Sequence, residues 1–310
     1  MIFLFNNLQT VALQVIILFI LIAVGFISGK TKILSDAAAK SCADLVLLLA
    51  TPCVIIQSFQ RKMDAAMLSG LLTAALVSLA VHMGGIALAR LFIRDPDEAR
   101  KKVLRFGVIF SNAGYMALPL QQALLGADGV FYGASYIAVF NIVLWTYGLI
   151  TMSGERKLTA KKLVLNPGIV AVAIGFVLFF CSVTLPPVIS EPVKYLAYLN
   201  TPLPMLVIGF YLSGANLLSA LKDKRSYLTI GLRLVVIPAL ALLAMWLCGI
   251  RGTLLVSCAV AASTPVAVAT TMFATKYRRD TSLSVNLVTV STLLSILTMP
   301  VIVAAAQLLA

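Results

Sequence analysis

Two stretches of the sequence combine a proline with small and polar residues inside apolar surroundings. The first is Phe110–Leu120, FSNAGYMALPL, and the second is Ala261–Thr271, AASTPVAVATT. Proline removes a backbone donor and clashes with the preceding turn, so we expect each helix to kink or break at Pro119 and at Pro265. A half-helix that begins at a break presents free N–H groups and a partial positive charge. The two stretches therefore predict a binding site for a carboxylate.

Side chains near the two prolines supply the hydrogen bonds that such a site needs. Asn112, Ser263 and Thr264 precede the prolines, and Gly114 and Tyr115 are further candidates in the first stretch. The alternative is a pair of simple kinks, since proline and glycine are common in membrane helices. Two such helices at corresponding places of an internal repeat favour a substrate site.

Four other polar residues lie inside apolar runs. Asn141 is expected near mid-depth, where it either lines the cavity or makes a packing hydrogen bond. Three residues are candidates for ion coupling. Asp44 fits either proton coupling or stabilisation of a first helical turn. His82 fits either a proton relay or a satisfied core histidine, and Arg233 either snorkels to the surface or serves as a counter-charge for the substrate.

The sequence holds too few suitable residues for a metal site or an enzyme active site. The five cysteines are scattered singly, and His82 is the only histidine, so we expect no metal site and no cofactor. No HExxH, GxSxG, P-loop or paired intramembrane aspartate is present, so an enzyme is not expected. Without a nucleotide site, transport would use an existing gradient. Protons are favoured over sodium, because no carboxylate cluster is present to hold a cation.

The composition is that of a membrane protein. Hydrophobic residues make up 61% of the 310 residues and charged residues 11%, with a mean hydropathy of +1.04. A soluble domain carries roughly 25% charged residues. Long apolar runs recur along the chain and predict an all-α polytopic protein with ten transmembrane helices. The predicted spans are 8–28, 40–59, 66–93, 102–125, 129–152, 166–185, 192–218, 226–248, 252–275 and 282–308.

The basic residues predict the orientation of these spans. Odd-numbered loops carry 19 lysines and arginines and even-numbered loops carry 4. This bias places the odd loops in the cytoplasm and both termini outside, in a bacterial inner membrane. Met1–Thr10 has no basic segment before the first apolar run, so we expect a retained helix there and not a signal peptide. The net charge of +13 is explained by membrane anchoring, and no nucleic-acid partner is expected.

An internal repeat divides the chain. Leu49–Cys53 reads LATPC and Leu199–Leu203 reads LNTPL, so that the two Thr-Pro pairs are offset by 150 residues. Two units of five helices must insert with opposite orientation, because five is an odd number. The sequence therefore predicts inverted repeats at 1–153 and 154–310, a plan shared by many secondary transporters.

Several motifs of this chain resemble the auxin efflux carrier family, which includes bacterial carboxylate permeases and plant auxin exporters. They are Ser111–Leu120, 166–169 (NPGI), Ser263–Pro265, Phe273–Tyr277 and Thr298–Pro300. The resemblance implies that broken helices four and nine cross beside the substrate site. It also implies a scaffold of helices 1, 2, 6 and 7, with helices 3–5 and 8–10 forming a mobile transport bundle.

Two positions depart from the family pattern. Ala117 stands where the family usually has glycine, and Thr270 stands where the plant exporters have a second proline. The expected substrate is therefore a small mono- or dicarboxylate and not auxin.

The sequence thus predicts a secondary transporter that moves a small organic anion by alternating access within membrane lipid. A sensor that binds the same ligand without moving it is the main alternative; a channel and an intramembrane enzyme are others. The sequence leaves open the substrate, the direction of transport, a proton or sodium as coupling ion, and the oligomeric state, which includes a homodimer.

Overall fold

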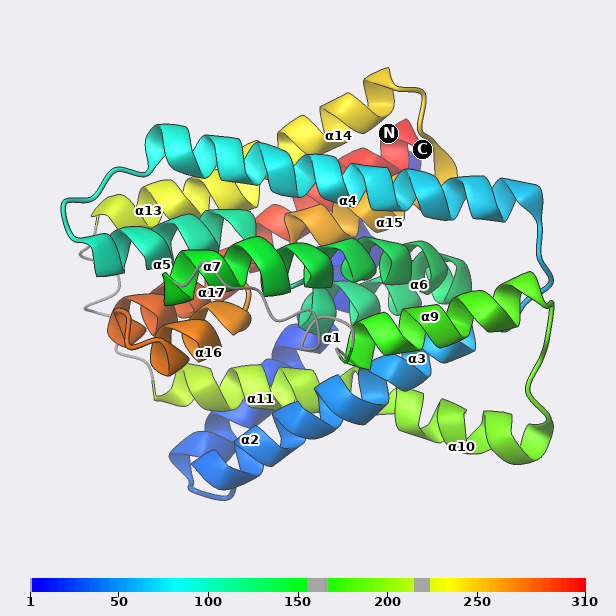
Figure 1. The fold of residues 1–310 in the computed structure, drawn as a ribbon, viewed down its shortest axis with the longest axis horizontal. Coiled ribbons are helices and arrows are strands. Elements are labelled where there is room, and N and C mark those ends of the chain that lie inside the picture. The colour runs from blue at the N-terminus through cyan, green and yellow to red at the C-terminus, as the bar shows by residue number, and fades with distance from the viewer. Residues whose placement is uncertain (1, 155–164, 166, 215–223) are drawn as a thin grey trace.

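The structure is a computed structural model that describes residues 2–154, 165, 167–214 and 224–310. Nearly all of this part is helical, and apart from one isolated β-bridge it contains no strand. The helices run roughly along the long axis of the molecule (Figure 1). Asn166, the loop residues 155–164 and the predicted end of span 192–218 lie outside the described residues.

The first half of the chain forms seven α-helices and three π-helical turns. They are α1 (Ile2–Lys30), α2 (Asp36–Leu45), η1 (Val46–Ala50), α3 (Thr51–Ser58), α4 (Ala65–Phe92), α5 (Glu98–Ile109), η2 (Ala113–Ala117), α6 (Leu118–Val143), η3 (Leu144–Gly148) and α7 (Leu149–Ser153).

The described second half contains α9 (Pro167–Phe180), α10 (Pro187–Tyr198), α11 (Pro202–Ser213), α13 (Lys224–Gly231), η4 (Leu232–Val236), α14 (Ile237–Leu247), α15 (Gly252–Ser263), α16 (Ala269–Lys276) and α17 (Thr281–Leu309).

Seven helical stretches of the described chain are long and apolar enough to cross a membrane, against the ten spans predicted. Two further apolar helices, α9 and α15, are shorter. Large apolar side chains project outward along these helices, among them Leu76, Val177 and Leu297, each more than half exposed. Such a surface suits a hydrocarbon solvent and not water. The predicted class, an all-helical membrane protein, is confirmed.

The longest of these stretches, Ala113–Ser153, has 41 residues and exceeds one crossing. At 1.5 Å per residue it would extend roughly 60 Å, about twice the hydrocarbon thickness. Gly126 breaks it, with φ +63° and ψ −150°, a conformation that only glycine adopts readily. The gap between the predicted spans 102–125 and 129–152 thus coincides with a break at Gly126 that separates two helical segments within α6.

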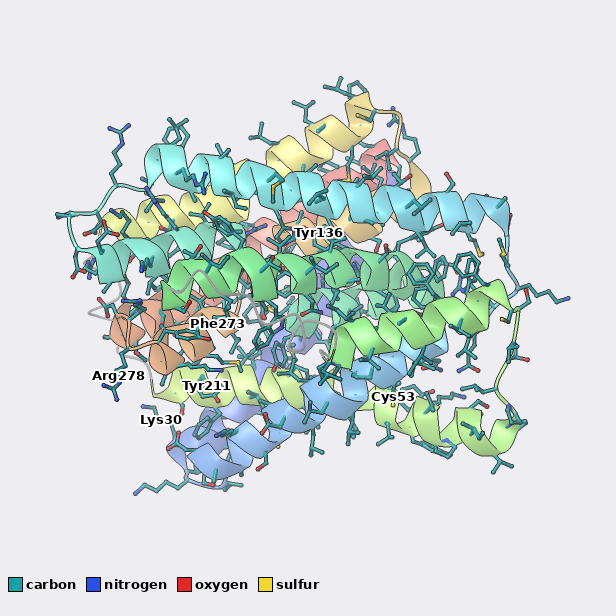
Figure 2. All side chains as sticks on the ribbon, viewed as in Figure 1. Lys30, Cys53, Tyr136, Tyr211, Phe273 and Arg278 are labelled. Carbon is teal, nitrogen blue, oxygen red and sulfur yellow. The ribbon has the colours of Figure 1, made fainter. Side chains whose placement is uncertain are left out.

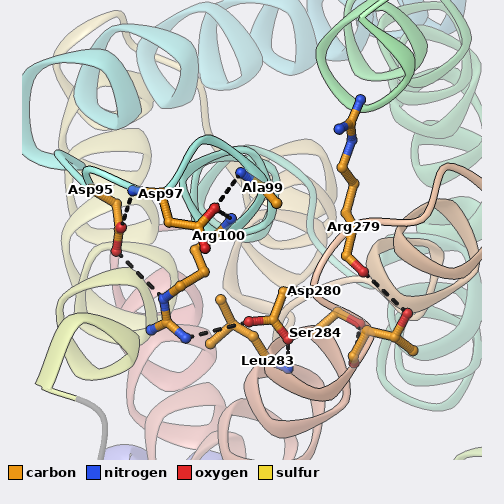
Figure 3. Close-up of polar contacts among 9 residues, drawn as sticks. Asp95, Asp97, Ala99, Arg100, Arg279, Asp280, Leu283 and Ser284 are labelled. Carbon is orange, nitrogen blue, oxygen red and sulfur yellow. Dashed lines mark hydrogen bonds and ion pairs between the residues drawn. The ribbon is translucent and has the colours of Figure 1, made fainter.

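Charged side chains join two loops at one end of the molecule. Lys30 and Arg278 lie at the same edge in Figure 2, whereas Tyr136 lies near the middle. Figure 3 shows the ion pairs that join loops at this end: Arg100 contacts Asp95 at 3.6 Å and Asp280 at 3.3 Å. These contacts hold the α4–α5 loop against the turn that precedes α17.

Aspartates of the same cluster also cap helices. The Asp97 carboxylate accepts from the N–H groups of Ala99 and Arg100 at the start of α5, and that of Asp280 accepts from Leu283 N–H in α17. Each cap satisfies donors that have no partner within the helix. Aspartate caps therefore determine where α5 and α17 begin.

Helices α1 and α11 pack closely because a glycine of each helix faces the backbone of the other helix where the two meet. A Cβ atom on Gly209 would overlap the carbonyl oxygen of Ile22, and one on Gly25 would overlap that of Leu206. Small residues allow this approach in membrane helices, where dispersion and not water drives packing.

Gly209→Ala is expected to destabilise the protein by about 1–3 kcal/mol, the usual cost of overpacking. The measurement is the thermal unfolding midpoint in detergent, followed by tryptophan fluorescence. Gly231→Ala is the matched control, since nothing lies within 4 Å of a Cβ there. Equal midpoints for both variants would contradict the packing account.

Candidate functional site

The first interrupted helix breaks before Pro119, not at it. Helix α5 ends at Ile109, Phe110 is extended, and η2 begins at Ala113. Pro119 is the second residue of α6 and follows the π-helical turn η2 without a break. The prediction of a break at Pro119 was therefore wrong in position.

Other prolines in the chain show why Pro119 leaves its helix continuous. Pro52 and Pro238 are also second residues of α-helices, and each follows a π-helical turn, η1 or η4. A π turn changes the pairing of the preceding carbonyls and so accommodates the missing proline N–H. Proline in these contexts produces a local widening of the helix.

The second interruption lies at Pro265, as predicted. Helix α15 ends at Ser263, Thr264 is extended, and α16 begins at Ala269. One freed donor in this break, Val266 N–H, is bound by the Ser291 hydroxyl of α17 at 3.1 Å.

The two interruptions pair with each other. Asn112 N–H donates to the Pro265 carbonyl at 2.7 Å, and Ala267 N–H donates to the Phe110 carbonyl at 3.0 Å. Ser111 and Val266 form an antiparallel bridge between these bonds. Because hydrocarbon offers no other partner, this pairing satisfies backbone groups that the breaks leave free.

Arg233 lies beneath this pairing and is only 1% exposed. Its guanidinium donates to the carbonyls of Val108 and Ile109 at the end of α5, and to that of Ala262 at the end of α15. The expectation that Arg233 snorkels to the surface is wrong, because three inward carbonyls hold the side chain. A cation at helix C-termini is electrostatically favoured.

A cavity of about 300 Å³ adjoins the paired segments. Gly114 of η2 and Ala269 of α16, near the N-termini of the two half-helices, line it. Each N-terminus contributes roughly half a positive charge, so together they offset about one negative charge. The polar residues of the lining are Thr51, Ser111, Asn112, Tyr115, Asn141 and Lys276.

Three polar atoms of this lining are unsatisfied. Ser111 Oγ, Asn112 Nδ2 and Tyr115 OH are buried and have no hydrogen-bond partner in the described part of the chain. Each buried orphan group costs about 1–3 kcal/mol. Their clustering beside one cavity is typical of a site completed by a ligand or water.

The predicted site residues divide into two sets. The structure brings Asn112, Gly114, Tyr115 and Asn141 together at the cavity. Pro119 lines a separate cavity of about 200 Å³, together with Gln57, Gln122 and Asn200.

Ser263, Thr264 and Pro265 are absent from the cavity lining. The Ser263 hydroxyl donates to Val260 O and that of Thr264 to Ala261 O, each at 3.0 Å within the last turn of α15. The Pro265 carbonyl is used by Asn112. These three residues belong to the second interruption, which pairs with the first; the two paired interruptions are called the crossing below.

Lys276 was not predicted as a site residue. It ends α16, and its ammonium lies 5.7 Å from the Tyr277 ring. Lys276 lines both the 300 Å³ cavity and a neighbouring one of about 460 Å³ that also includes Asp44. The signal in the sequence was a basic residue directly after an apolar run that contains a proline.

The remaining coupling candidates lie apart from the 300 Å³ cavity. His82 is buried among the rings of Phe110, Tyr136 and Phe140, and its Nδ1 lies 2.6 Å from the Ser78 carbonyl. These contacts match a satisfied core histidine.

Asp44 is exposed and lies near the end of α2, which begins at Asp36 after the Ser35 cap. The interpretation of Asp44 as a first-turn residue is therefore wrong. Asp36 holds that position.

The chain matches the family model described as membrane transport protein over residues 10–161 and 156–303. It is similar to an uncharacterized transporter of Methanothermobacter thermautotrophicus, with 24% identity over 91% of this chain and 93% of the relative. It is also similar to an uncharacterized transporter of Methanocaldococcus jannaschii, with 25% identity over 91% and 94%. The resemblance to auxin efflux carriers is confirmed at this level, and the chain belongs to the membrane transport protein family.

Proposed function

We propose that the protein is a secondary transporter of a small organic anion, a mono- or dicarboxylate, that works by alternating access. The cluster of unsatisfied polar atoms from Ser111, Asn112 and Tyr115 beside two half-helix N-termini supports this function. A carboxylate accepts several hydrogen bonds and carries the charge that the helix ends favour. The cavity, about 300 Å³, suits a small ligand.

The proposed architecture has ten crossings in two inverted repeats, 1–153 and 154–310. If the stretch that folds back at Gly126 counts as two crossings, and α9 and the α15–α16 pair are added, the seven stretches become ten. The basic loops lie in the cytoplasm and both termini outside, in the bacterial inner membrane.

The proposed moving parts follow the packing of the helices. Helices α1 and α11 pack together, and α3 packs on α9 and α10, which supports a scaffold of these elements. Helices α4, α6, α14, α15 and α17 form a second packed group, to which the paired interruptions after α5 and α15 belong, and α17 also packs on α1. The cavity lies between the groups, with Thr51 and Gly168 on one side and Asn112 and Asn141 on the other. Sliding of one group past the other would expose the site to either side in turn.

Counterflow in proteoliposomes tests this proposal. Vesicles loaded with unlabelled lactate, pyruvate, succinate or malate would be diluted into the labelled compound, with imposed pH or sodium gradients in parallel. Saturable, transient accumulation of at least one carboxylate is expected. Binding without counterflow would identify a sensor, and non-saturating flux a channel; either result would contradict the proposal.

A further inference from the structure

Arg233 carries a charge that the binding of substrate does not use. It is fully buried and, together with Asp95, it is one of two charged side chains in the described chain that are buried. Asp95 lies in a loop and contacts Arg100. None of the ion pairs among the described residues includes Arg233.

The partners of Arg233 are carbonyl oxygens from two different half-helices. Val108 and Ile109 belong to the end of α5, and Ala262 belongs to the end of α15. Each helix C-terminus carries roughly half a negative charge, so the two ends together match the single charge of the guanidinium. The planar fork of arginine reaches several acceptors at once, which a lysine ammonium does less well.

The crossing thus has one side with the partial positive charges of helix N-termini and another with the partial negative charges of helix C-termini. The half-helix N-termini and the cavity are on one side, and the C-termini with Arg233 are on the other. A helix dipole has no net charge, and Lys276, which also lines the cavity, is exposed at the end of α16. The buried charge of this unit is therefore the +1 of Arg233 when the cavity is empty. A bound monocarboxylate brings the sum to zero.

We propose that Arg233 is a counter-charge that moves together with the substrate, so that the transport unit loaded with a monocarboxylate crosses the membrane field with no net buried charge. This inference rests on the proposed function. Arg233 is a positioning residue, because it acts through the ends of α5 and α15 without lining the cavity. In the empty unit the +1 charge is uncompensated, and the membrane potential therefore acts on the return step.

Voltage dependence of exchange tests the inference, because exchange uses only the loaded steps. Proteoliposomes containing unlabelled lactate would exchange it for labelled lactate at potentials of 0 and −100 mV set by potassium and valinomycin. Pyruvate and butyrate would be used in the same way. For wild type, an exchange rate that changes by less than about twofold is expected, since a neutral body feels no field.

Arg233→Met removes the charge and leaves the loaded unit at −1. Exchange should then change several-fold per 100 mV, below the roughly 50-fold limit for one charge that crosses the whole field. Arg233→Lys keeps the charge and should exchange more slowly yet without voltage dependence. Arg251→Met is the matched control, since Arg251 lies exposed in the α14–α15 loop and binds Trp246 and Ile250 carbonyls.

Steep voltage dependence of wild-type exchange would overturn the inference, whether or not Arg233→Met folds. Voltage-independent exchange by a folded Arg233→Met protein would overturn it as well. Failure of all three monocarboxylates to exchange at 0 mV is a different result: it would overturn this inference, whereas the proposed function would fail only if the dicarboxylates also gave no counterflow.

Discussion

Asn112→Ala is expected to reduce carboxylate uptake by about 10- to 100-fold. The Asn112 side chain lies at the crossing, is 2% exposed and has an unsatisfied Nδ2 donor. A hydrogen bond to a charged group contributes about 1.5–3 kcal/mol, and each 1.4 kcal/mol is a tenfold change. Initial uptake rates in proteoliposomes across a range of substrate concentrations would give the change in kcat/KM.

Thr264→Ala is the matched control for this experiment. Thr264 lies in the opposite break, but its hydroxyl is bonded to the Ala261 carbonyl and does not line the cavity. Its removal should change uptake by less than about threefold, because the hydroxyl makes no contact with the substrate cavity. Unchanged uptake by Asn112→Ala would refute the site. An equal loss in both variants would show that the crossing, and not the cavity, determines uptake.

Gly114→Leu is expected to abolish transport while the protein remains folded. Gly114 lines the cavity, and nothing lies within 4 Å of a Cβ placed there. A Cβ therefore fits there without overlap, and the rest of a leucine side chain would extend into the cavity that Gly114 lines. The measurement is counterflow, with the thermal unfolding midpoint recorded on the same preparation.

Gly84→Leu provides the comparison, because Gly84 is also open but lies in an apolar groove between α4 and α14. It should transport at close to the wild-type rate. Full transport by Gly114→Leu would show that the substrate does not occupy this cavity. An equal loss by Gly84→Leu would attribute the effect to added bulk in the bundle.

Much of the fold could be predicted from the sequence, because the bilayer allows few solutions. Apolar runs of about 20 residues must be helical, since each backbone group has to find its partner within the segment. The gap between the predicted spans 102–125 and 129–152 contains Gly126, whose conformation is strained for other residues and which breaks the helix there. The count of membrane-length helices was harder, because breaks at 110–112 and 264–268 leave pieces shorter than one crossing.

The location of the first break could not be predicted from the proline rule. Pro119 suggested a break at its own position, yet the helix tolerates it through the turn η2. The break at Phe110–Asn112 depends on pairing with Pro265 and Ala267, which lie far along the chain. Such a tertiary hydrogen bond has no local signal.

The site residues were predicted better for the first interruption, at 110–112, than for the second, at 264–268. Asn112 and Tyr115 reach the cavity, whereas the hydroxyls of Ser263 and Thr264 turn back onto their own helix. Serine and threonine near a helix end can bond a carbonyl three or four residues earlier, and residue type alone does not reveal this choice.

The direction of the long Arg233 side chain could not be predicted for a different reason. Its direction depends on which carbonyls lie within reach, and those belong to α5 and α15. From the sequence, snorkelling to the surface and burial were both open, because an arginine stem is long enough for either.

Accessibility of the cavity from both faces is the most direct test of the account. Gly114→Cys would be introduced into a protein whose five native cysteines are replaced by alanine or serine. Right-side-out and inside-out vesicles would be treated with a membrane-impermeant thiol reagent, with and without a carboxylate that gives counterflow. We expect labelling from both faces and slower labelling when the carboxylate is present. Labelling from one face only, or labelling that the carboxylate does not slow, would contradict alternating access at this site.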